Sequence, residues 1–132
     1  MERQKKVIDA SIAAKWFLNE DGTKEALSIR DDHIGEETLI IVPEVLFLEV
    51  LNALRYKNAD KKLLESASKI LFEIQLHVER TNEFILCKAI NISLEYGLTI
   101  YDSIYAAIAQ LHGCPLITAD EKLRKFPSAV AL

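Results

Sequence analysis

The stretch TLIIV, from Thr38 to Val42, is a continuous run of apolar and mostly β-branched residues. A strand that is apolar at every position needs cover on both faces, which is typical of parallel sheets with helices on either side. Two further stretches predict short strands of the same kind, VID at 7–9 and PLITAD at 115–120. These three runs predict an α/β fold.

Helical patterns separate the predicted strands. The spacing of apolar residues predicts helices over about 11–19, 23–30, 43–57, 60–76, 83–96 and 98–113, a short helix at 121–126 and further strands at 77–81 and 129–132. Strands that alternate with helices predict a three-layer α/β/α architecture with a mainly parallel central sheet. The chain has 132 residues and no linker or repeat, so we expect one domain over residues 1–132.

Composition excludes some classes of protein. The net charge of −4 is not that of a basic nucleic-acid coat. Cys87 and Cys114 lie far apart, without the spacing of a zinc site, and we expect both to be buried thiols.

The basic N-terminus followed by an apolar stretch imitates a signal peptide, but Asp9 and Lys15 interrupt it. No apolar run approaches the ~20 residues of a membrane span, so we expect a cytoplasmic protein.

Two of the predicted strands end in an aspartate. VIDAS places Asp9 at the end of the first strand, and LITAD places Asp120 at the end of another. Ligands of open α/β sheets bind beyond the carboxyl ends of the strands, so these two carboxylates are candidates for one site. Each is equally suited to be the N-cap of the helix that follows.

Two helices carry carboxylates in apolar surroundings. Glu49 lies in the middle of PEVLFLEVLNAL, where its neighbours at i±3 and i±4 are Val45, Leu46, Asn52 and Ala53, a mostly apolar face. Glu44 instead suits the first turn, where it complements the helix dipole. Asp102 begins a helix of small and apolar residues, and shares its face with Tyr105, Ala106 and Ala109. Asp102 could also be an N-cap, but a mid-helix position leaves Glu49 without that explanation.

Carboxylates buried together are costly unless a cation accompanies them. Hard oxygen ligands of this kind suit Mg²⁺ or Mn²⁺, which are typical of phosphate chemistry. The hydroxyl of Ser11 follows Asp9 by two residues, and that of Thr118 precedes Asp120 by two. Each hydroxyl could bind a metal-bound water or a phosphate oxygen, or could make a local cap or turn hydrogen bond.

The segments VIDASIAAKWF, PEVLFLEVLNAL and GLTIYDSIYAAIAQLHGCPLITADEKL resemble the PIN-domain nucleases, in particular the VapC-type toxins of prokaryotic toxin–antitoxin pairs. The family pattern is an Asp that ends the first strand, an E-x-x-N helix, a Y-D-x-x-Y helix and a T-x-D strand end. All four blocks occur here in order, between Val7 and Leu123. Each block alone is weak evidence, but four in order are specific.

The resemblance implies a role for each matching residue. It implies a divalent-metal-dependent endoribonuclease that acts on single-stranded or loop RNA, forms homodimers and is inhibited by a cognate antitoxin. Thr118 matches the site hydroxyl of the family and Asn52 its helix asparagine, while Ser11 matches a position that the family fills variably. The implied metal-binding and catalytic acids are Asp9, Glu49, Asp102 and Asp120.

The resemblance, and not the net charge, implies that RNA is the substrate. Metal bound to the four acids would bring that charge near zero, so that basic residues could hold phosphates, although surface solvation is the plainer explanation for any of them. These residues are Lys5, Lys6, Lys15 (on the first helix), Arg55, Lys57, Lys61 and Lys62. Tyr101 or Tyr105 could stack an unpaired base, or pack in the core. Trp16 and Phe17 suit the core or a dimer interface.

Other classes of protein fit the pattern less well. A phosphoacceptor receiver domain needs an acidic pair after its first strand, and a haloacid-dehalogenase-type phosphatase needs D-x-D where this chain has DAS. The remaining alternative is a PIN-like RNA-binding or RNA-processing module without cleavage activity of its own.

Overall fold

The fold was analysed in a computed structural model, in which residues 3–132 are described. The strands are β1 Gln4–Ile8, β2 Thr38–Pro43, β3 His77–Glu79, β4 Leu116–Thr118 and β5 Ala129–Ala131. The α-helices are α1 Ala10–Ala14, α2 Thr23–Ile34, α3 Val45–Tyr56, α4 Lys61–Glu73, α5 Glu83–Tyr96 and α6 Ile100–His112. Short 3₁₀ helices cover Lys15–Phe17 and Leu123–Lys125.

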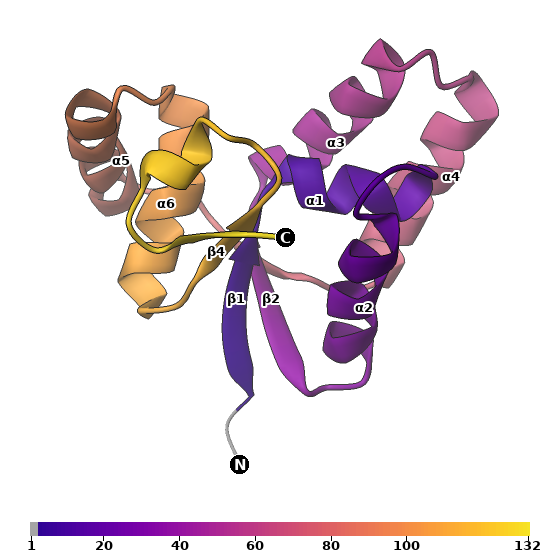
Figure 1. Ribbon diagram of the computed structural model, residues 1–132, viewed down its shortest axis with the longest axis horizontal. Coiled ribbons are helices and arrows are strands. Elements are labelled where there is room, and N and C mark those ends of the chain that lie inside the picture. The colour runs from indigo at the N-terminus through magenta and orange to yellow at the C-terminus, as the bar shows by residue number, and fades with distance from the viewer. Residues whose placement is uncertain (1–2) are drawn as a thin grey trace.

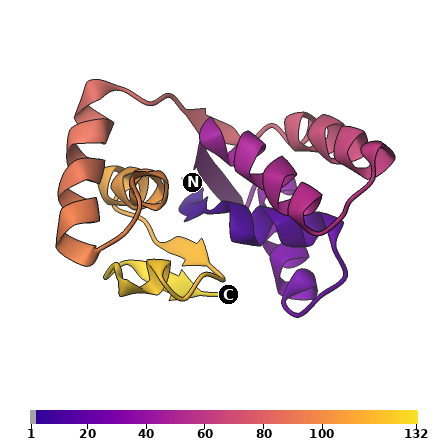
Figure 2. The same cartoon turned by 90° about the horizontal axis from the view of Figure 1, so that it is seen from above.

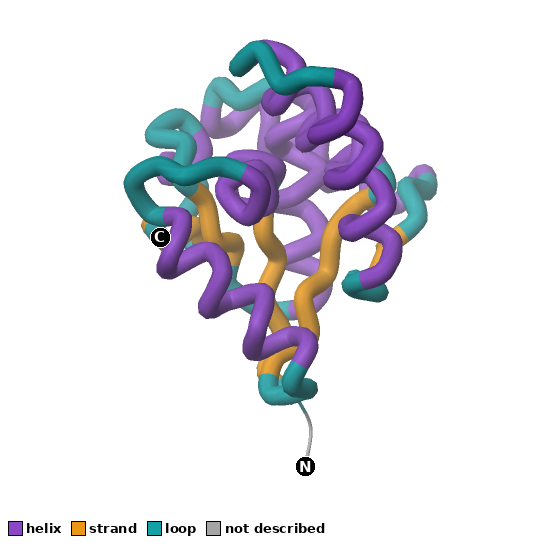
Figure 3. The backbone as a smooth tube through the Cα atoms, turned by 90° about the vertical axis from the view of Figure 1, so that its right-hand side faces the viewer, coloured by secondary structure: helices purple, strands orange, loops and turns teal. Residues whose placement is uncertain are grey.

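The five strands form one sheet in the order β3-β2-β1-β4-β5. Every neighbouring pair is parallel, with Val7 of β1 opposite Ile41 of β2 and Leu116 of β4. The predicted α/β fold is therefore confirmed, and the sheet is entirely rather than mainly parallel. The strands rise from the end of the molecule that carries the N-terminus (Figures 1 and 3), so their carboxyl ends meet at the opposite end.

Helices cover both faces of the sheet. In Figure 1, α5 and α6 lie on one side of the strands, and α1 to α4 lie on the other. The central strands are buried between these two layers, as the uninterrupted apolar run at 38–42 predicts. The large side chains with almost no exposure come from every layer, among them Ile8, Ile40, Leu46, Leu71, Ile108 and Leu116.

Local structure differs from the prediction at three places. The first helix ends at Ala14 and continues as a 3₁₀ turn, so it is shorter than the predicted 11–19. Pro43 is the last residue of β2 and not part of the next helix, which suits a residue with fixed φ and no N–H at a strand end. Cys114 is buried as expected, but Cys87 is exposed on α5 and the prediction for it was wrong.

The helices α5 and α6 end at glycines. Gly97 and Gly113 follow α5 and α6 with φ of 66° and 60°, the left-handed conformation that glycine adopts without steric cost. Trp16 is buried in the core, where its indole N–H donates to the carbonyl of Ala26 at 2.8 Å. Within residues 3–132, no helix has the length and apolar character that crossing a membrane requires.

Candidate active site

A cavity of about 470 Å³ opens at the carboxyl end of the sheet. Figure 2 looks onto this end, with α6 in orange on one side and α1 and α3 in indigo and magenta on the other. The four acids predicted from the sequence all line this cavity, together with Ser11 and Asn52. The remaining lining residues are Ala10, Ala53, Tyr56, Lys57 and Tyr105.

Asp9 is held at the end of β1 by three donors. Its Oδ1 accepts from the Ser11 hydroxyl at 2.5 Å and from the Ile12 amide at 3.3 Å, and its Oδ2 accepts from the Thr118 hydroxyl at 2.5 Å. Asp9 is therefore the N-cap of α1 and also faces the cavity, so the two interpretations of this residue are compatible. Only 5% of it is exposed, and this burial raises the pKa of its carboxyl against the opposing effect of the three hydrogen bonds.

The two hydroxyls that bind Asp9 join β1 to the end of β4. Ser11 Oγ accepts from the Ala119 amide at 2.9 Å, and Thr118 Oγ1 accepts from the Asp120 amide at 2.9 Å. Each hydroxyl is thus a donor to Asp9 and an acceptor from the segment that follows β4, which fixes the direction of its proton. This hydroxyl clamp, formed by Ser11 and Thr118, sets the position of Asp9 relative to the backbone of Asp120.

Glu49 reaches the cavity from the middle of α3. Its Oε1 accepts from the Tyr105 hydroxyl of α6 at 2.6 Å, a contact between helices on opposite sides of the sheet. Burial raises the pKa of Glu49, the Tyr105 hydrogen bond opposes this effect, and the charges of Asp102 and Asp9 raise it further. Tyr105 itself is 1% exposed, so it orients Glu49 and cannot be a platform for a base.

Asp102 and Asp120 are half-buried, as Glu49 is. Thr99 is the N-cap of α6, with its hydroxyl accepting from the Asp102 amide at 3.1 Å, so Asp102 lies in the first turn and is not the cap. Burial raises the pKa of Asp102, and the charge of Asp120 is the next cause. Asp120 follows β4, where its Oδ1 accepts from the Lys122 amide at 2.9 Å.

Lys15 lies outside the cavity, Lys57 is the predicted basic residue that lines it, and the lining residue Tyr56 was not predicted. The Lys15 ammonium is turned to Glu20, at 3.1 Å, and to the Asp21 carbonyl, at 2.7 Å, and Lys15 does not line the cavity. Lys57 and Tyr56 do line it. The spacing of Tyr56 from Glu49, seven residues along one helix, was the sequence signal that could have identified it.

The donor set of the cavity fits a hard divalent cation. It offers carboxylate oxygens from four acids, and the charges of Asp9, Asp102 and Asp120 are among the causes that raise the pKa values of their neighbours. Among the described residues, none of these four acids forms an ion pair with Lys, Arg or His. No group of three acidic, His or Cys side chains in residues 3–132 is already arranged around a common point.

The sequence profile of the PIN domain matches residues 6–128. Ribonuclease VapC3 of Pyrobaculum aerophilum is 31% identical over 96% of this chain and 98% of its own length. The structure of PAE2754, also from Pyrobaculum aerophilum, has a TM-score of 0.71 at 23% identity, covering 97% of this chain and 83% of that one. A toxin–antitoxin complex from Klebsiella pneumoniae contains a chain with a TM-score of 0.71 at 20% identity, covering 95% of both chains.

The chain belongs to the PIN-domain family. Within that family, it is homologous to the VapC ribonuclease toxins. The resemblance seen in the four sequence blocks is confirmed.

Proposed function

We propose that this protein is a divalent-metal-dependent endoribonuclease that hydrolyses RNA phosphodiester bonds, and that it is the toxin of a toxin–antitoxin pair. The observation that carries the proposal is the meeting of four carboxylates from β1, α3, α6 and the end of β4 on one cavity. Homology to a ribonuclease over 96% of the chain supports RNA as the substrate class.

The residues that would hold Mg²⁺ or Mn²⁺ are Asp9, Glu49, Asp102 and Asp120. Such an ion, when bound, activates a water for attack and offsets the charge that develops on the phosphate. Catalysis of this kind depends on ligands held in position before the substrate arrives. The hydrogen bonds of the four acids indicate which residues hold them in position.

Two of the acids are fixed by neutral donors. Both Asp9 oxygens accept from the hydroxyl clamp, which prevents the carboxylate from rotating about its terminal bond. Glu49 is oriented through one oxygen by Tyr105, so that its other oxygen is available to the cavity. We assign Ser11, Thr118 and Tyr105 as positioning residues and Asn52, which lines the cavity, as a polar contact for substrate or water.

We also propose two protein partners, an antitoxin and a second copy of this chain. The structurally similar chain from Klebsiella pneumoniae was solved as a toxin–antitoxin complex, which supports a cognate antitoxin for this protein. A homodimer is implied by the resemblance to the family alone.

The test is cleavage of a structured RNA mixture by the purified protein, in Mg²⁺ or Mn²⁺ against EDTA. The Asp120→Asn variant removes one proposed ligand, and Glu121→Gln, one residue along and exposed, is the matched control for the lost charge. We expect metal-dependent cleavage by the wild type and Glu121→Gln, and none by Asp120→Asn. Metal-dependent RNA binding without cleavage by any of the three would instead indicate an RNA-binding or RNA-processing module.

A further inference from the structure

The last turn of α3 brings an exposed aromatic and an exposed lysine to the rim of the cavity. Tyr56 and Lys57 both line the cavity, yet 88% of Tyr56 and 51% of the Lys57 side chain are exposed. An aromatic ring that is almost wholly in water contributes little to the core, so packing does not explain why it is here.

The rim residues continue the helix face that carries the proposed metal ligand. Glu49, Asn52, Ala53, Tyr56 and Lys57 all line the cavity, at the i, i+3, i+4, i+7, i+8 spacing of a single face. At 1.5 Å per residue, Lys57 lies roughly 12 Å along the helix axis from Glu49. The small side chain of Ala53 leaves room between the polar and the aromatic part of this face.

Neighbouring charged side chains hold the Lys57 ammonium in place without neutralising it. Glu20 binds Lys57 through Oε2 at 2.5 Å and Lys15 through Oε1 at 3.1 Å, so the group of three carries one net positive charge. This ion pair holds the Lys57 ammonium at the rim. Among the described contacts it uses one of the three N–H donors of Lys57, so that two remain for other acceptors. Lys57 is the one cation among the described residues that line the cavity.

We propose that the α3 face from Asn52 to Lys57 is a subsite for single-stranded RNA, in which Tyr56 stacks on an unpaired base and Lys57 binds a phosphate next to that base. The inference deepens the proposed function, on which it rests for the nature of the substrate. Of the two tyrosines predicted to stack a base, Tyr105 is buried, and Tyr101 is exposed but lines a neighbouring hollow with Glu49 and Asn52 and not this cavity.

The chemistry of the face favours a nucleic acid over a peptide. A basic peptide would be attracted by the four acids but repelled by Lys57, and an acidic peptide could pair with Lys57 and a bound cation but has no flat base to stack on Tyr56. A nucleotide strand presents a flat base to Tyr56 and a phosphate to Lys57, and its next phosphates can lie at the metal-binding end of the cavity. Stacking needs no particular base, so the subsite would hold the strand without selecting its sequence.

The test is binding of a fluorescein-labelled, random-sequence RNA octamer, followed by fluorescence anisotropy in Mg²⁺ at several salt concentrations. Every protein carries Asp120→Asn, so that the RNA stays intact while variants are compared in one background. The variants are Tyr56→Ala, Tyr56→Phe and Lys57→Ala, with Lys61→Ala as the matched control for an exposed lysine that does not line the cavity.

We expect each rim variant to have its own signature. Tyr56→Ala should weaken binding by about 5- to 100-fold without changing its salt dependence, and Tyr56→Phe should restore it, because the ring and not the hydroxyl stacks. Lys57→Ala should weaken binding by about threefold at 0.1 M salt and reduce the slope of log K against log salt by about 0.7, the value for one phosphate contact. Lys61→Ala should bind as the parent does.

Several results would overturn the inference. Equal RNA binding by Tyr56→Ala and the parent would show that Tyr56 does not stack on a base, and would indicate that this face binds a protein partner instead. An undiminished salt slope in Lys57→Ala would show that Lys57 does not bind a phosphate. Absence of RNA binding by the parent would also overturn it. Failure of the proposed nuclease is a separate result, because it is read from cleavage by the wild type. As a positional check, 5-iodouridine in the octamer should photocrosslink to Tyr56, and a crosslink confined to other residues would contradict the subsite.

Discussion

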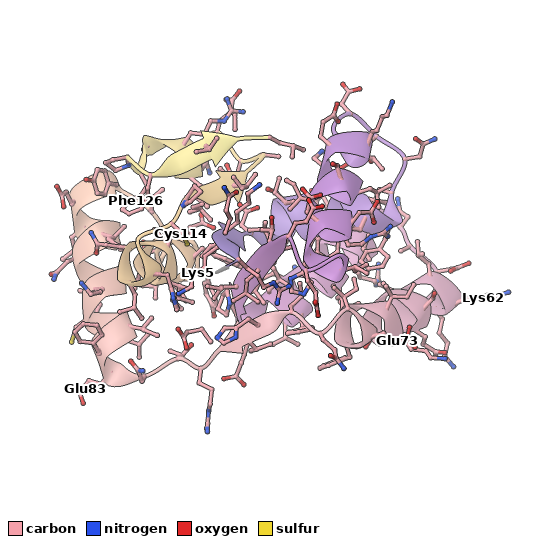
Figure 4. The ribbon with its side chains drawn as sticks, turned by 90° about the horizontal axis from the view of Figure 1, so that it is seen from below. Lys5, Lys62, Glu73, Glu83, Cys114 and Phe126 are labelled. Carbon is pink, nitrogen blue, oxygen red and sulfur yellow. The ribbon has the colours of Figure 1, made fainter. Side chains whose placement is uncertain are left out.

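The two ends of the central sheet carry hollows of similar size and opposite chemistry. The hollow where the strands end has a volume of about 470 Å³, and one where they begin has about 400 Å³. Figure 4 shows the second end from below, with Lys5 and Cys114 as neighbours. Arg3, Lys6 and His112 also line this amino-terminal hollow.

The difference between the two ends lies in how their charges are satisfied. At the amino-terminal end, Arg3 donates to the carbonyls of His33 and Thr38, His112 is 2.7 Å from a Glu79 oxygen, and Lys5 is exposed. At the carboxyl end, the acids are buried or half-buried and are held by neutral hydroxyls and amides. Volume is therefore a poor guide to function here, whereas charge that is held in place without a counter-charge is a good one.

The largest effect is expected for Asp9→Asn, which keeps the shape of the side chain and removes its charge. Cleavage should fall by at least about 100-fold, because even partners outside the ligand shell of a metal commonly contribute 10- to 100-fold. Asp60, the exposed N-cap of α4, is the matched control, and Asp60→Asn should cleave at the wild-type rate. Rates measured on the same RNA would decide this, and an active Asp9→Asn enzyme would remove Asp9 from the site.

Thr118→Val tests the hydroxyl clamp. It deletes the donor to Asp9 and the acceptor for the Asp120 amide in a side chain with no exposure, so cleavage should fall by about 10- to 100-fold and the free energy of unfolding by about 1–3 kcal/mol. Thr38, buried at the start of β2, provides the same substitution at the other end of the sheet. Thr38→Val should cleave normally, and equal loss in both variants would mean that only stability is affected.

Tyr105→Phe tests the orientation of Glu49. Loss of the 2.6 Å hydrogen bond should reduce cleavage by about tenfold and weaken the affinity for Mn²⁺, with the fold unchanged. Tyr96 packs edge-on against Phe126, away from the cavity, and Tyr96→Phe is the control. Titration calorimetry with Mn²⁺ is the measurement, and an unchanged affinity in Tyr105→Phe would show that Glu49 needs no support from α6.

The pH dependence of stability should reveal the unpaired charges at the carboxyl end of the sheet. Burial raises the pKa values of Asp9, Glu49 and Asp102 above their ordinary 3.8 or 4.5, so in EDTA their ionisation destabilises the folded state as pH rises through the raised values. The melting temperature of Asp9→Asn relative to the wild type should therefore be higher at pH 7.5 than at pH 4.5. Thermal melts in EDTA at both values test this, and a difference that grows toward low pH would contradict it.

The smallest effect is expected at the amino-terminal hollow. Lys5→Ala removes an exposed charge that no described contact links to the acids, so cleavage and the melting temperature should both stay at wild-type values. A loss of cleavage in Lys5→Ala, measured under the same conditions, would mean that the RNA extends to this end of the sheet and that the comparison of the two ends is incomplete.

The sequence allowed prediction of what depends on periodicity and chain order. The apolar run at 38–42 predicted the parallel sheet, and the rule that parallel strands end at one edge predicted that Asp9 and Asp120 would meet. Glu49 and Asp102 were predicted from charge in apolar surroundings, and both line the same cavity.

Contacts between side chains distant in the sequence could not be predicted in the same way. Tyr105 and Glu49 are 56 positions apart, and their hydrogen bond depends on how α3 and α6 pack across the end of the sheet. Lys15 was predicted near the cavity because its helix begins there, but Glu20 and Asp21, which follow the turn, bind its ammonium. Cys87 was predicted to be buried because free cysteines are among the most buried residue types, and its exposure on α5 is an exception to that tendency.

The central claim is that the four carboxylates hold a divalent ion at the carboxyl end of the sheet. The most direct measurement is anomalous diffraction from a crystal of the wild-type protein soaked in Mn²⁺. We predict an anomalous peak in the cavity, within bonding distance of Asp9 and of at least one of the other three acids, and no such peak in Asp9→Asn crystals. A saturating soak that leaves the cavity without a peak would contradict the claim.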